Sequence, residues 1–429
     1  MLNKLKKQIS SAKPSSKPEG NDRLMVGLDI GTEFVKALVA RIDEDNQIEI
    51  LGVGRAHQSL TDMQAGAIAD IAAVVANCDS ALNQAEQQAG VSARSAVIGI
   101  AGELVKGTTT TVRFTRKDPN KEIDLDEVDR IFGHIQTRAL EKAKKQLSVE
   151  LGGKNIDLKL VNSALISIEI DGYGVTNPIG FKGKDVSVQL YTAFAPLIHI
   201  GAIERVAEQL DLDLLTVAAE PFAVARSVIG DDPNANLSAI LIDVGGGTTD
   251  IAVVNEGGVE GTKMFGIGGR SFTKSIERDL NTDFDRAEAL KLGLTSGRTP
   301  EPRVKSVEAA LKKTLTVWDN GVQLALEEFK RLEHLPHTVY LCGGGASLSM
   351  LTESLAQSSW YADLPFARKP QVKLIDPSQV VGITDTTNII DDHTYITAMG
   401  LLRVGMDTLL QYEAPTNSIK ERLNRILKV

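Results

Sequence analysis

Near the middle of the chain, two apolar runs flank three glycines in the stretch AILIDVGGGTTDIAVV, residues 239–254. The apolar runs predict two buried strands. The glycines predict a tight turn that takes positive φ angles and exposes backbone N–H groups. Such a turn suits phosphate oxygens, and Thr248 and Thr249 add hydroxyl donors. Asp243 and Asp250 are placed to hold a divalent metal through water. The alternative is a glycine-rich hairpin without a ligand, but a plain turn has no need of the two carboxylates.

A similar pattern occurs near the beginning of the chain. Residues 24–42 alternate as strand, glycine turn and strand, and a polar turn then leads to a third strand, which predicts an antiparallel meander. The segment Leu28 to Thr32, LDIGT, repeats the order of Ile242 to Gly245, with threonine after the glycines in both places. One such hairpin in each half of the chain predicts an internal duplication with a cleft between two related domains.

The pattern between these hairpins changes twice. Residues 70–90 predict a helix that stops at Gly90. Residues 103–186 then combine a Thr/Val run, a long charged helix (125–147) and strand-like segments, which predicts an inserted, surface-mounted module. Beyond the module we expect a strand, a Glu-Pro junction and a helix at 214–230, and a helix at 304–331.

Two further glycine turns are candidates for contact with a ligand. One is GIGG at 266–269, which opens a helix, and the other is the strand, glycine turn and helix that begins at His337. A helix N-terminus beside small residues favours close backbone approach and weak attraction of anions. Small residues at Ala398 and Gly400 predict a helix that packs tightly against another backbone.

The composition limits the classes of function. Hydrophobic content of 42% and charged content of 24% are those of an ordinary globular protein. A net charge of −9 and only 4% aromatic residues argue against nucleic acid as a partner. Cys78 and Cys342 predict two buried thiols in a reducing compartment. No apolar run is long enough to span a bilayer, so we expect a cytoplasmic protein unless a peripheral segment attaches it.

Both ends of the chain are basic. Residues 1–20 predict a flexible arm whose first nine residues form either a short membrane-surface helix or a frayed terminus. Residues 418–429, SIKERLNRILKV, predict a basic amphipathic helix with a capping box of Ser418 and Glu421. Such a helix suits a membrane surface, and a helix docked on the body is the alternative.

The order of these motifs resembles the actin/heat-shock chaperone/sugar-kinase ATPase superfamily and, within it, the bacterial cell-division actin FtsA. NPIG at 177–180, AAEPFAVA at 218–225 and AEALKLG at 287–293 resemble FtsA segments in the same order. The resemblance implies an α/β actin-like ATPase fold of two related domains with an FtsA-type inserted subdomain. It divides the chain into an arm (1–20), a first domain (21–102, 187–221 and 385–411), the insertion (103–186), a second domain (222–384), a linker (412–417) and a terminal helix (418–429).

The resemblance also implies roles for individual residues. Asp29 and Asp243 would organise hydrated Mg²⁺, and Glu220 would orient an attacking water. Lys36 we interpret as an exposed strand residue. The residues that would line the ATP are Gly31, Thr32, Gly245, Gly246, Gly247, Thr248, Thr249, Gly268, Gly269, Glu288, Lys291, Gly344 and Gly345.

The function that this resemblance implies is a cell-division protein on the cytoplasmic face of the membrane at the division site. It would bind ATP, show at most weak ATPase activity, assemble into filaments, anchor FtsZ through its C-terminal peptide and recruit other divisome proteins. The basic arm resembles instead the start of PilM, so a pilus-assembly platform remains an alternative. A small-molecule kinase of the same fold is a further alternative, although no aspartate base for a sugar site is evident.

Overall fold

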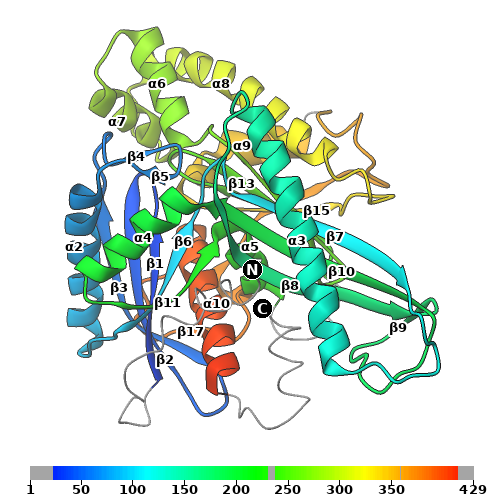
Figure 1. Ribbon diagram of the computed structural model, residues 1–429. Helices are drawn as coiled ribbons and strands as arrows, with labels where there is room; N and C mark the ends of the chain where they lie inside the picture. Colours follow the sequence, from blue (N-terminus) through cyan, green and yellow to red (C-terminus); the bar gives the residue numbers. More distant parts are fainter. Residues whose placement is uncertain (1–22, 230–236, 358, 414–429) are drawn as a thin grey trace.

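The structure is a computed structural model that describes residues 23–229, 237–357 and 359–413. A six-stranded sheet forms the first half, in the order β11-β6-β1-β2-β3-β17. β1, β2 and β3 form the predicted antiparallel meander, and β6 and β11 extend the sheet as parallel strands (Figure 1). The strands are β1 (Arg23–Ile30), β2 (Phe34–Ile42), β3 (Ile48–His57), β6 (Ser95–Ile100), β11 (Asp213–Ala219) and β17 (Ile383–Asp385).

Helices pack against this sheet because its strands are apolar on both faces. α2 (Ile71–Ala89) packs on β3 and β2, and α10 (Ile396–Glu413) packs on β1 and α5 (Glu220–Ile229). α2 ends as predicted at Gly90, whose φ of 68° allows its N–H to reach the Glu86 carbonyl. Cys78 and Cys342 are both buried thiols, as predicted.

A nine-stranded sheet forms the second half together with the inserted segment, in the order β16-β15-β12-β13-β14-β7-β10-β8-β9. β12 pairs antiparallel with β13 and parallel with β15, as β1 pairs antiparallel with β2 and parallel with β6. This repeated pairing confirms the predicted duplication. The strands are β7 (Lys106–Thr115), β8 (Leu158–Ile170), β9 (Tyr173–Gly174), β10 (Asp185–Pro196), β12 (Ala239–Val244), β13 (Thr249–Asn255), β14 (Gly258–Phe265), β15 (Thr338–Cys342) and β16 (Gln371–Leu374).

Helices of the second half cover the core beneath β12 and β13. α6 (Gly269–Leu280) and α8 (Glu301–Glu327) pack together there, and Phe272, Val307 and Trp318 are buried in this core. α8 begins three residues before the predicted start because Pro302, which lacks an N–H, is tolerated in a first turn. The remaining elements are β4 (Met63–Gln64), β5 (Ala67–Ile68), α4 (Leu197–Gln209), α7 (Phe284–Thr295), η1 (Gly344–Ser347), α9 (Ser349–Gln357), η2 (Pro377–Gln379) and η3 (His393–Tyr395).

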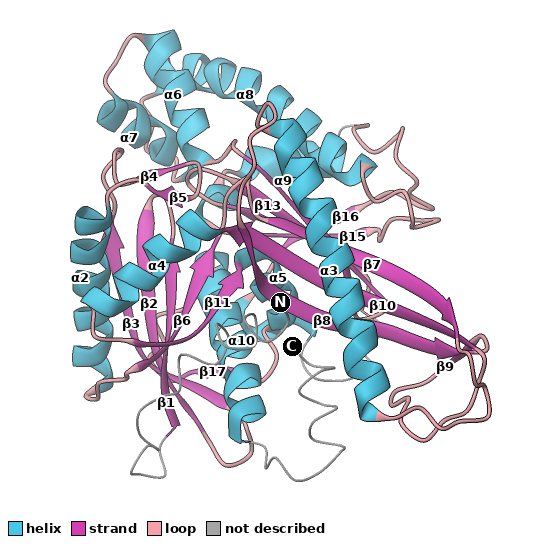
Figure 2. Ribbon diagram, in the orientation of Figure 1, coloured by secondary structure: helices cyan, strands magenta, loops and turns pink. Residues whose placement is uncertain are grey.

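The inserted segment consists of β7, β8, β9, β10 and α3 (Leu125–Glu150), and Figure 2 shows it extending sideways from the body. It is more than a surface attachment, because β7 pairs with β14 at Gly107 and Thr108 and so continues the second sheet. α3 buries Val128, Phe132 and Ile135 against the strands of the segment. β10 continues this segment to Pro196, past the expected end at residue 186, so we call residues 103–196 the inserted module.

The sequence predicts an arm at one end of the chain and an amphipathic helix at the other. Residues 1–20 and 418–429 lie outside the described residues, as does most of the predicted linker. α10 continues to Glu413, so the first two residues of that linker are helical instead. None of the described helices is long and apolar enough to cross a membrane.

Candidate functional site

The two glycine hairpins face each other. In the second hairpin, Asp243 lies opposite Asp250 in the strand register. In the first, Asp29 lies opposite Lys36, and its Oδ2 accepts a bond of 2.9 Å from Lys36 Nζ. The duplication therefore places a lysine in one hairpin where the other has an aspartate, and both pairs are buried or nearly so. The interpretation of Lys36 as an exposed strand residue is wrong, since its side chain is only 12% exposed.

The glycines of the second hairpin serve close approach rather than unusual backbone angles. None of Gly245, Gly246 and Gly247 has a positive φ, which corrects the prediction from sequence. A Cβ on Gly247 would lie 2.7 Å from Thr32 Oγ1, and one on Gly246 would lie 2.8 Å from the Glu33 side chain. Any larger residue would therefore push the two hairpins apart.

Four carboxylates gather behind the hairpins: Asp29, Asp243, Asp250 and Glu220 are all buried. Burial raises the pKa of Asp243, Asp250 and Glu220, and mutual repulsion raises the pKa values of Asp250 and Glu220 further. Lys36 is the cation that faces them. Burial lowers its pKa, but Asp29 outweighs that effect and the net shift is upward.

Thr397 at the start of α10 closes the cluster by donating its hydroxyl to Asp243 Oδ2. On Asp250, Thr248 donates to Oδ2 at 3.1 Å, whereas Oδ1 is buried and has no hydrogen-bond partner. An excess of buried negative charge with an unpartnered oxygen favours a bound cation.

These residues fit Mg²⁺ held through water rather than by direct ligation. In the described part of the chain, no group of three or more His, Cys, Asp or Glu side chains is placed to ligate a metal directly. Mg²⁺ keeps several waters and shares one or two carboxylates with substrate phosphates, which suits Asp29 and Asp243. Bound there with ATP, Mg²⁺ would neutralise the phosphate charge.

The glycine turn before α6 lies against the second hairpin. A Cβ on Gly268 would be 2.6 Å from the Gly245 carbonyl oxygen, and Gly269 N–H donates to that same oxygen at 2.9 Å. Lys291 Nζ bonds to Thr273 Oγ1 at 2.9 Å and pairs with Glu288 at 2.7 Å. The structure thus brings the predicted Gly268, Gly269, Glu288 and Lys291 together on the second half of the molecule.

The third glycine turn, which follows β15, also lies next to Asp243. Cys342, the last residue of β15, is the register partner of Asp243 in the parallel pair of β12 and β15. Gly343 has a φ of 82°, and a Cβ there would lie 2.0 Å from Asp243 Oδ1. The predicted Gly344 borders open space, whereas Gly345 packs against Val244. Gly343 belongs to the predicted glycine turn but not to the residues predicted to line the ATP, and the structure shows that it also approaches the site closely.

A second feature that the sequence did not indicate is an ion pair between the halves. Arg270, at the start of α6, bonds through Nε to Glu33 Oε2 at 2.6 Å and through a terminal nitrogen to the Gln58 carbonyl at 3.2 Å. The other oxygen of Glu33 lies 2.9 Å from His57 Nε2. This group joins the first hairpin and the end of β3 to the second half of the molecule.

Glu220 offers a test of the electrostatics, because its replacement by glutamine should stabilise the ligand-free protein at higher pH. A carboxyl with a raised folded-state pKa contributes stability that is full below the unfolded pKa and is lost as the pH rises through the folded pKa. Glutamine has no such dependence. The melting temperature of Glu220→Gln minus that of the wild type should therefore increase from about pH 5 to about pH 8.

The exposed Glu141→Gln on α3 is the matched control, and its difference from the wild type should stay near zero across this range. A Glu220→Gln difference that is constant with pH would show that Glu220 is ionised in the folded protein at every pH tested.

The arrangement of two duplicated sheets with facing hairpins is that of an actin-like ATPase fold with an inserted subdomain. A chain in a solved structure titled "PilM-PilN type IV pilus biogenesis complex" superposes on this one with a TM-score of 0.63. The match covers 91% of this chain and 99% of that chain at 16% identity, which shows a shared fold.

Comparison of sequences indicates which proteins of this fold the chain resembles. A family model described as "Cell division protein FtsA" matches residues 240–400. The chain is 27% identical to cell division protein FtsA of Pseudomonas aeruginosa over 90% of this chain and 89% of that protein. It is 27% identical to FtsA of Bacillus subtilis (85% and 82% covered) and 26% identical to FtsA of Escherichia coli K12 (91% and 92%). The resemblance to FtsA, predicted from the sequence motifs, is confirmed.

Proposed function

We propose that this chain is an actin-like cell-division protein that binds ATP with Mg²⁺ between its two halves. The observation that carries the proposal is the pair of duplicated hairpins, which bring Asp29, Lys36 and Asp243 into one buried cluster. The FtsA relatives, which match across most of the chain, supply the biological context.

In this proposal, nucleotide acts as a switch. ATP would bridge the two hairpins and favour a closed state that assembles into filaments, which is a shift of populations. The ion pair between Arg270 and Glu33 supports this idea, because it already joins the halves at the mouth of the same site. Divisome assembly at the division site and attachment to FtsZ through its C-terminal peptide follow from the same resemblance.

The raised pKa of Glu220 favours at most weak ATP hydrolysis. Burial and the neighbouring carboxylates hold the pKa of Glu220 well above its usual range. A raised pKa increases the fraction of Glu220 in the protonated form, and that form cannot accept a proton from an attacking water. We therefore assign it a water-orienting role that operates only in a closed, cation-loaded state.

The alternative function is a pilus-assembly platform, which the PilM fold match favours. A binding experiment separates the two functions. We expect the labelled C-terminal peptide of FtsZ to bind the full-length protein saturably in fluorescence anisotropy, and labelled PilN to bind at least about tenfold more weakly. A scrambled FtsZ peptide is the control. The opposite order of affinities would contradict the division proposal. A small-molecule kinase would instead show ATP turnover that depends on an added substrate.

We also propose that residues 418–429 attach the protein to the inner face of the cell membrane. Lys420, Arg422, Arg425 and Lys428 outnumber Glu421, and each basic residue near an anionic leaflet contributes about 1 kcal/mol. Deleting residues 418–429 should therefore remove the protein from the pellet when anionic liposomes are sedimented. Deleting residues 1–20 is the control, and unchanged sedimentation after the first deletion together with loss after the second would assign attachment to the arm.

A further inference from the structure

A groove of about 560 Å³ lies on the inserted module, between β7 and the first half of α3. All the residues that line it belong to the module, and none belongs to the hairpin site. Val112 and Phe114 of β7 and Ile131 of α3 form its apolar part.

The wall formed by β7 is a strand edge. Val112, Arg113 and Phe114 are consecutive and all line the groove, whereas side chains on one face of a strand alternate. β7 pairs with β10 along its whole length, but on its other side it pairs with β14 only at Gly107 and Thr108. Within the described residues, the rest of that edge has no strand partner. Figure 2 shows β7 running outward from the body toward β9.

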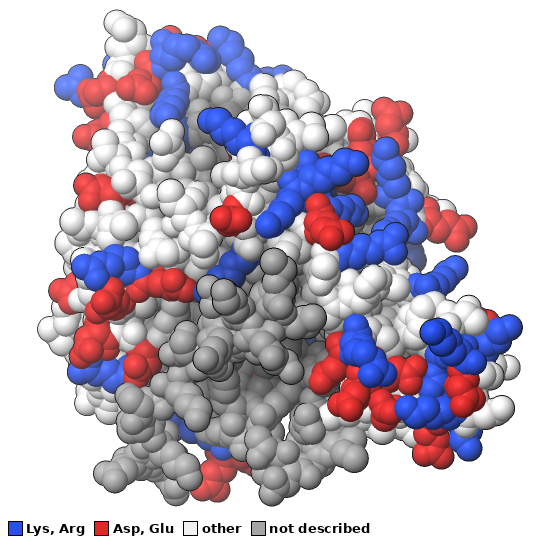
Figure 3. Space-filling view, viewed as in Figure 1, with Lys and Arg blue, Asp and Glu red and all other residues white. Residues whose placement is uncertain are grey.

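Six of the twelve side chains that line the groove are Lys or Arg, and two are acidic. Within the described part of the chain, four exposed ones form no ion pair: Arg113, Lys117, Arg130 and Arg138. The lining acid Glu127 is already engaged, because the buried Arg116 bonds to both of its oxygens at 2.7 and 3.0 Å. Asp118 is the other lining acid. Figure 3 shows both signs of charge mixed over the module, so the excess of positive charge is a property of this groove.

We propose that this groove binds an extended, acidic segment of a partner protein as an additional strand along β7. The open edge supplies main-chain donors and acceptors at the strand spacing of about 3.3 Å per residue, and alternate side chains of the added strand would point toward α3. Arg130 and Arg138 on the lining face of α3 select acidic side chains there. This inference stands apart from the proposed nucleotide switch and requires no nucleotide.

Charged residues on a strand edge also serve to prevent uncontrolled pairing between copies. Arg113 alone fits that role. Arg130, Arg138 and the apolar residue between them, Ile131, lie on α3 rather than on the edge, and they give the groove a second wall that edge protection does not require.

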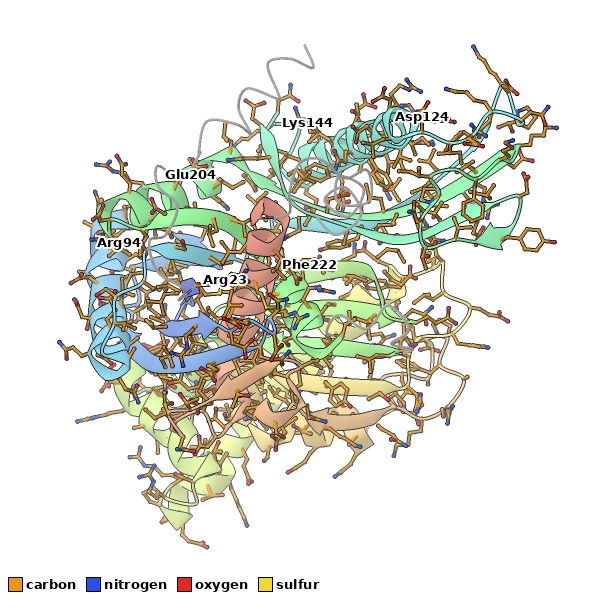
Figure 4. The ribbon with its side chains drawn as sticks, turned by 90° about the horizontal axis from the view of Figure 1, so that it is seen from below. Arg23, Arg94, Asp124, Lys144, Glu204 and Phe222 are labelled. Atoms are coloured by element: carbon orange, nitrogen blue, oxygen red, sulfur yellow. The ribbon has the colours of Figure 1, made fainter. Side chains whose placement is uncertain are left out.

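The test uses fluorescence anisotropy of the full-length protein with a labelled ten-residue peptide of alternating Glu and Thr at low ionic strength. We expect saturable binding that the double variant Arg130→Glu/Arg138→Glu weakens by about tenfold or more, because two attractions become repulsions. Lys144→Glu/Lys145→Glu changes the charge equally on the same helix but outside the groove, and it should weaken binding less than about twofold. Figure 4 places Lys144 far along α3 from Asp124, where the helix begins.

Two further peptides test the binding mode. The same peptide with alternate backbone nitrogens methylated cannot pair with a strand, and it should not bind; a Lys/Thr peptide should not bind either. Absence of saturable binding, equal losses in both double variants, or undiminished binding of the methylated peptide would each overturn the proposal. So would sedimentation that shows dimers which Arg130→Glu/Arg138→Glu dissociates, since the edge would then belong to a second copy. Unchanged melting temperatures of both variants establish that the folds are intact.

Discussion

Replacing Asp243 with alanine should abolish Mg²⁺-dependent ATP binding, with a loss of affinity of at least about 100-fold, or about 2.7 kcal/mol. Asp243 is the point at which all parts of the site meet. It lies at the end of β12, accepts the Thr397 hydroxyl, adjoins Gly343, and is close enough to Lys36 to affect the pKa of that lysine. Its removal would leave the phosphates and the metal without one of the two carboxylates placed to organise them.

Isothermal titration calorimetry with ATP, in the presence and absence of Mg²⁺, measures this effect. Asp243→Asn is the matched variant: it keeps the shape and the bond from Thr397 but removes the charge, so it should lose most of the Mg²⁺-dependent part of the affinity. Because Asp243 is a buried carboxylate whose pKa is raised, neither variant should unfold the protein. Wild-type affinity in Asp243→Ala would refute the role assigned to this residue.

The second large effect concerns the support of the second hairpin. Trp318 of α8 is fully buried, and its indole N–H donates to Thr249 Oγ1 at 2.9 Å. Thr249 in turn donates to the Ile267 carbonyl at 2.6 Å, in the glycine turn before α6. Trp318→Ala should therefore lower the free energy of unfolding by about 3–5 kcal/mol, through the cavity that it leaves and the loss of this chain of hydrogen bonds.

Urea denaturation checks this prediction, and Trp360 remains as a fluorescent reporter in the variant. Trp318→Phe is the control, since it keeps most of the buried ring and should lose much less stability, about 1–2 kcal/mol. A loss below about 1 kcal/mol in Trp318→Ala would mean that α8 relaxes into the space, and that the indole does not support the hairpin.

The sequence motifs predicted the duplicated architecture because they are local. Asp29-Ile-Gly and Asp243-Val-Gly are each a strand end followed by a turn, and alternating apolar runs on either side identify the strands without reference to distant residues. The resemblance to FtsA itself is confirmed by the family match to residues 240–400 and by the relatives. The roles of individual site residues remain proposals.

Several features depend on contacts between segments far apart in the chain, and local pattern carries no information about them. The local pattern predicts that Lys36 is an exposed strand residue. In the structure the second half of the molecule covers Lys36 and brings Asp243 close to it. Arg270 meets Glu33 only because α6 lies across the mouth of the first hairpin. The glycines at 246 and 247 are required by the approach of Thr32 and Glu33, rather than by the turn in which they lie.

By itself, the sequence predicted the two hairpins, the carboxylates near the ends of their strands and an inserted module between them. These features arise from periodicity and turn chemistry over a few residues. Only the tertiary structure decided which charges are paired, which carboxyls have raised pKa values, and that the free edge of β7 borders a basic groove. Burial and pairing depend on what packs against each residue, and here those neighbours come from the other half of the chain or from the far side of the module.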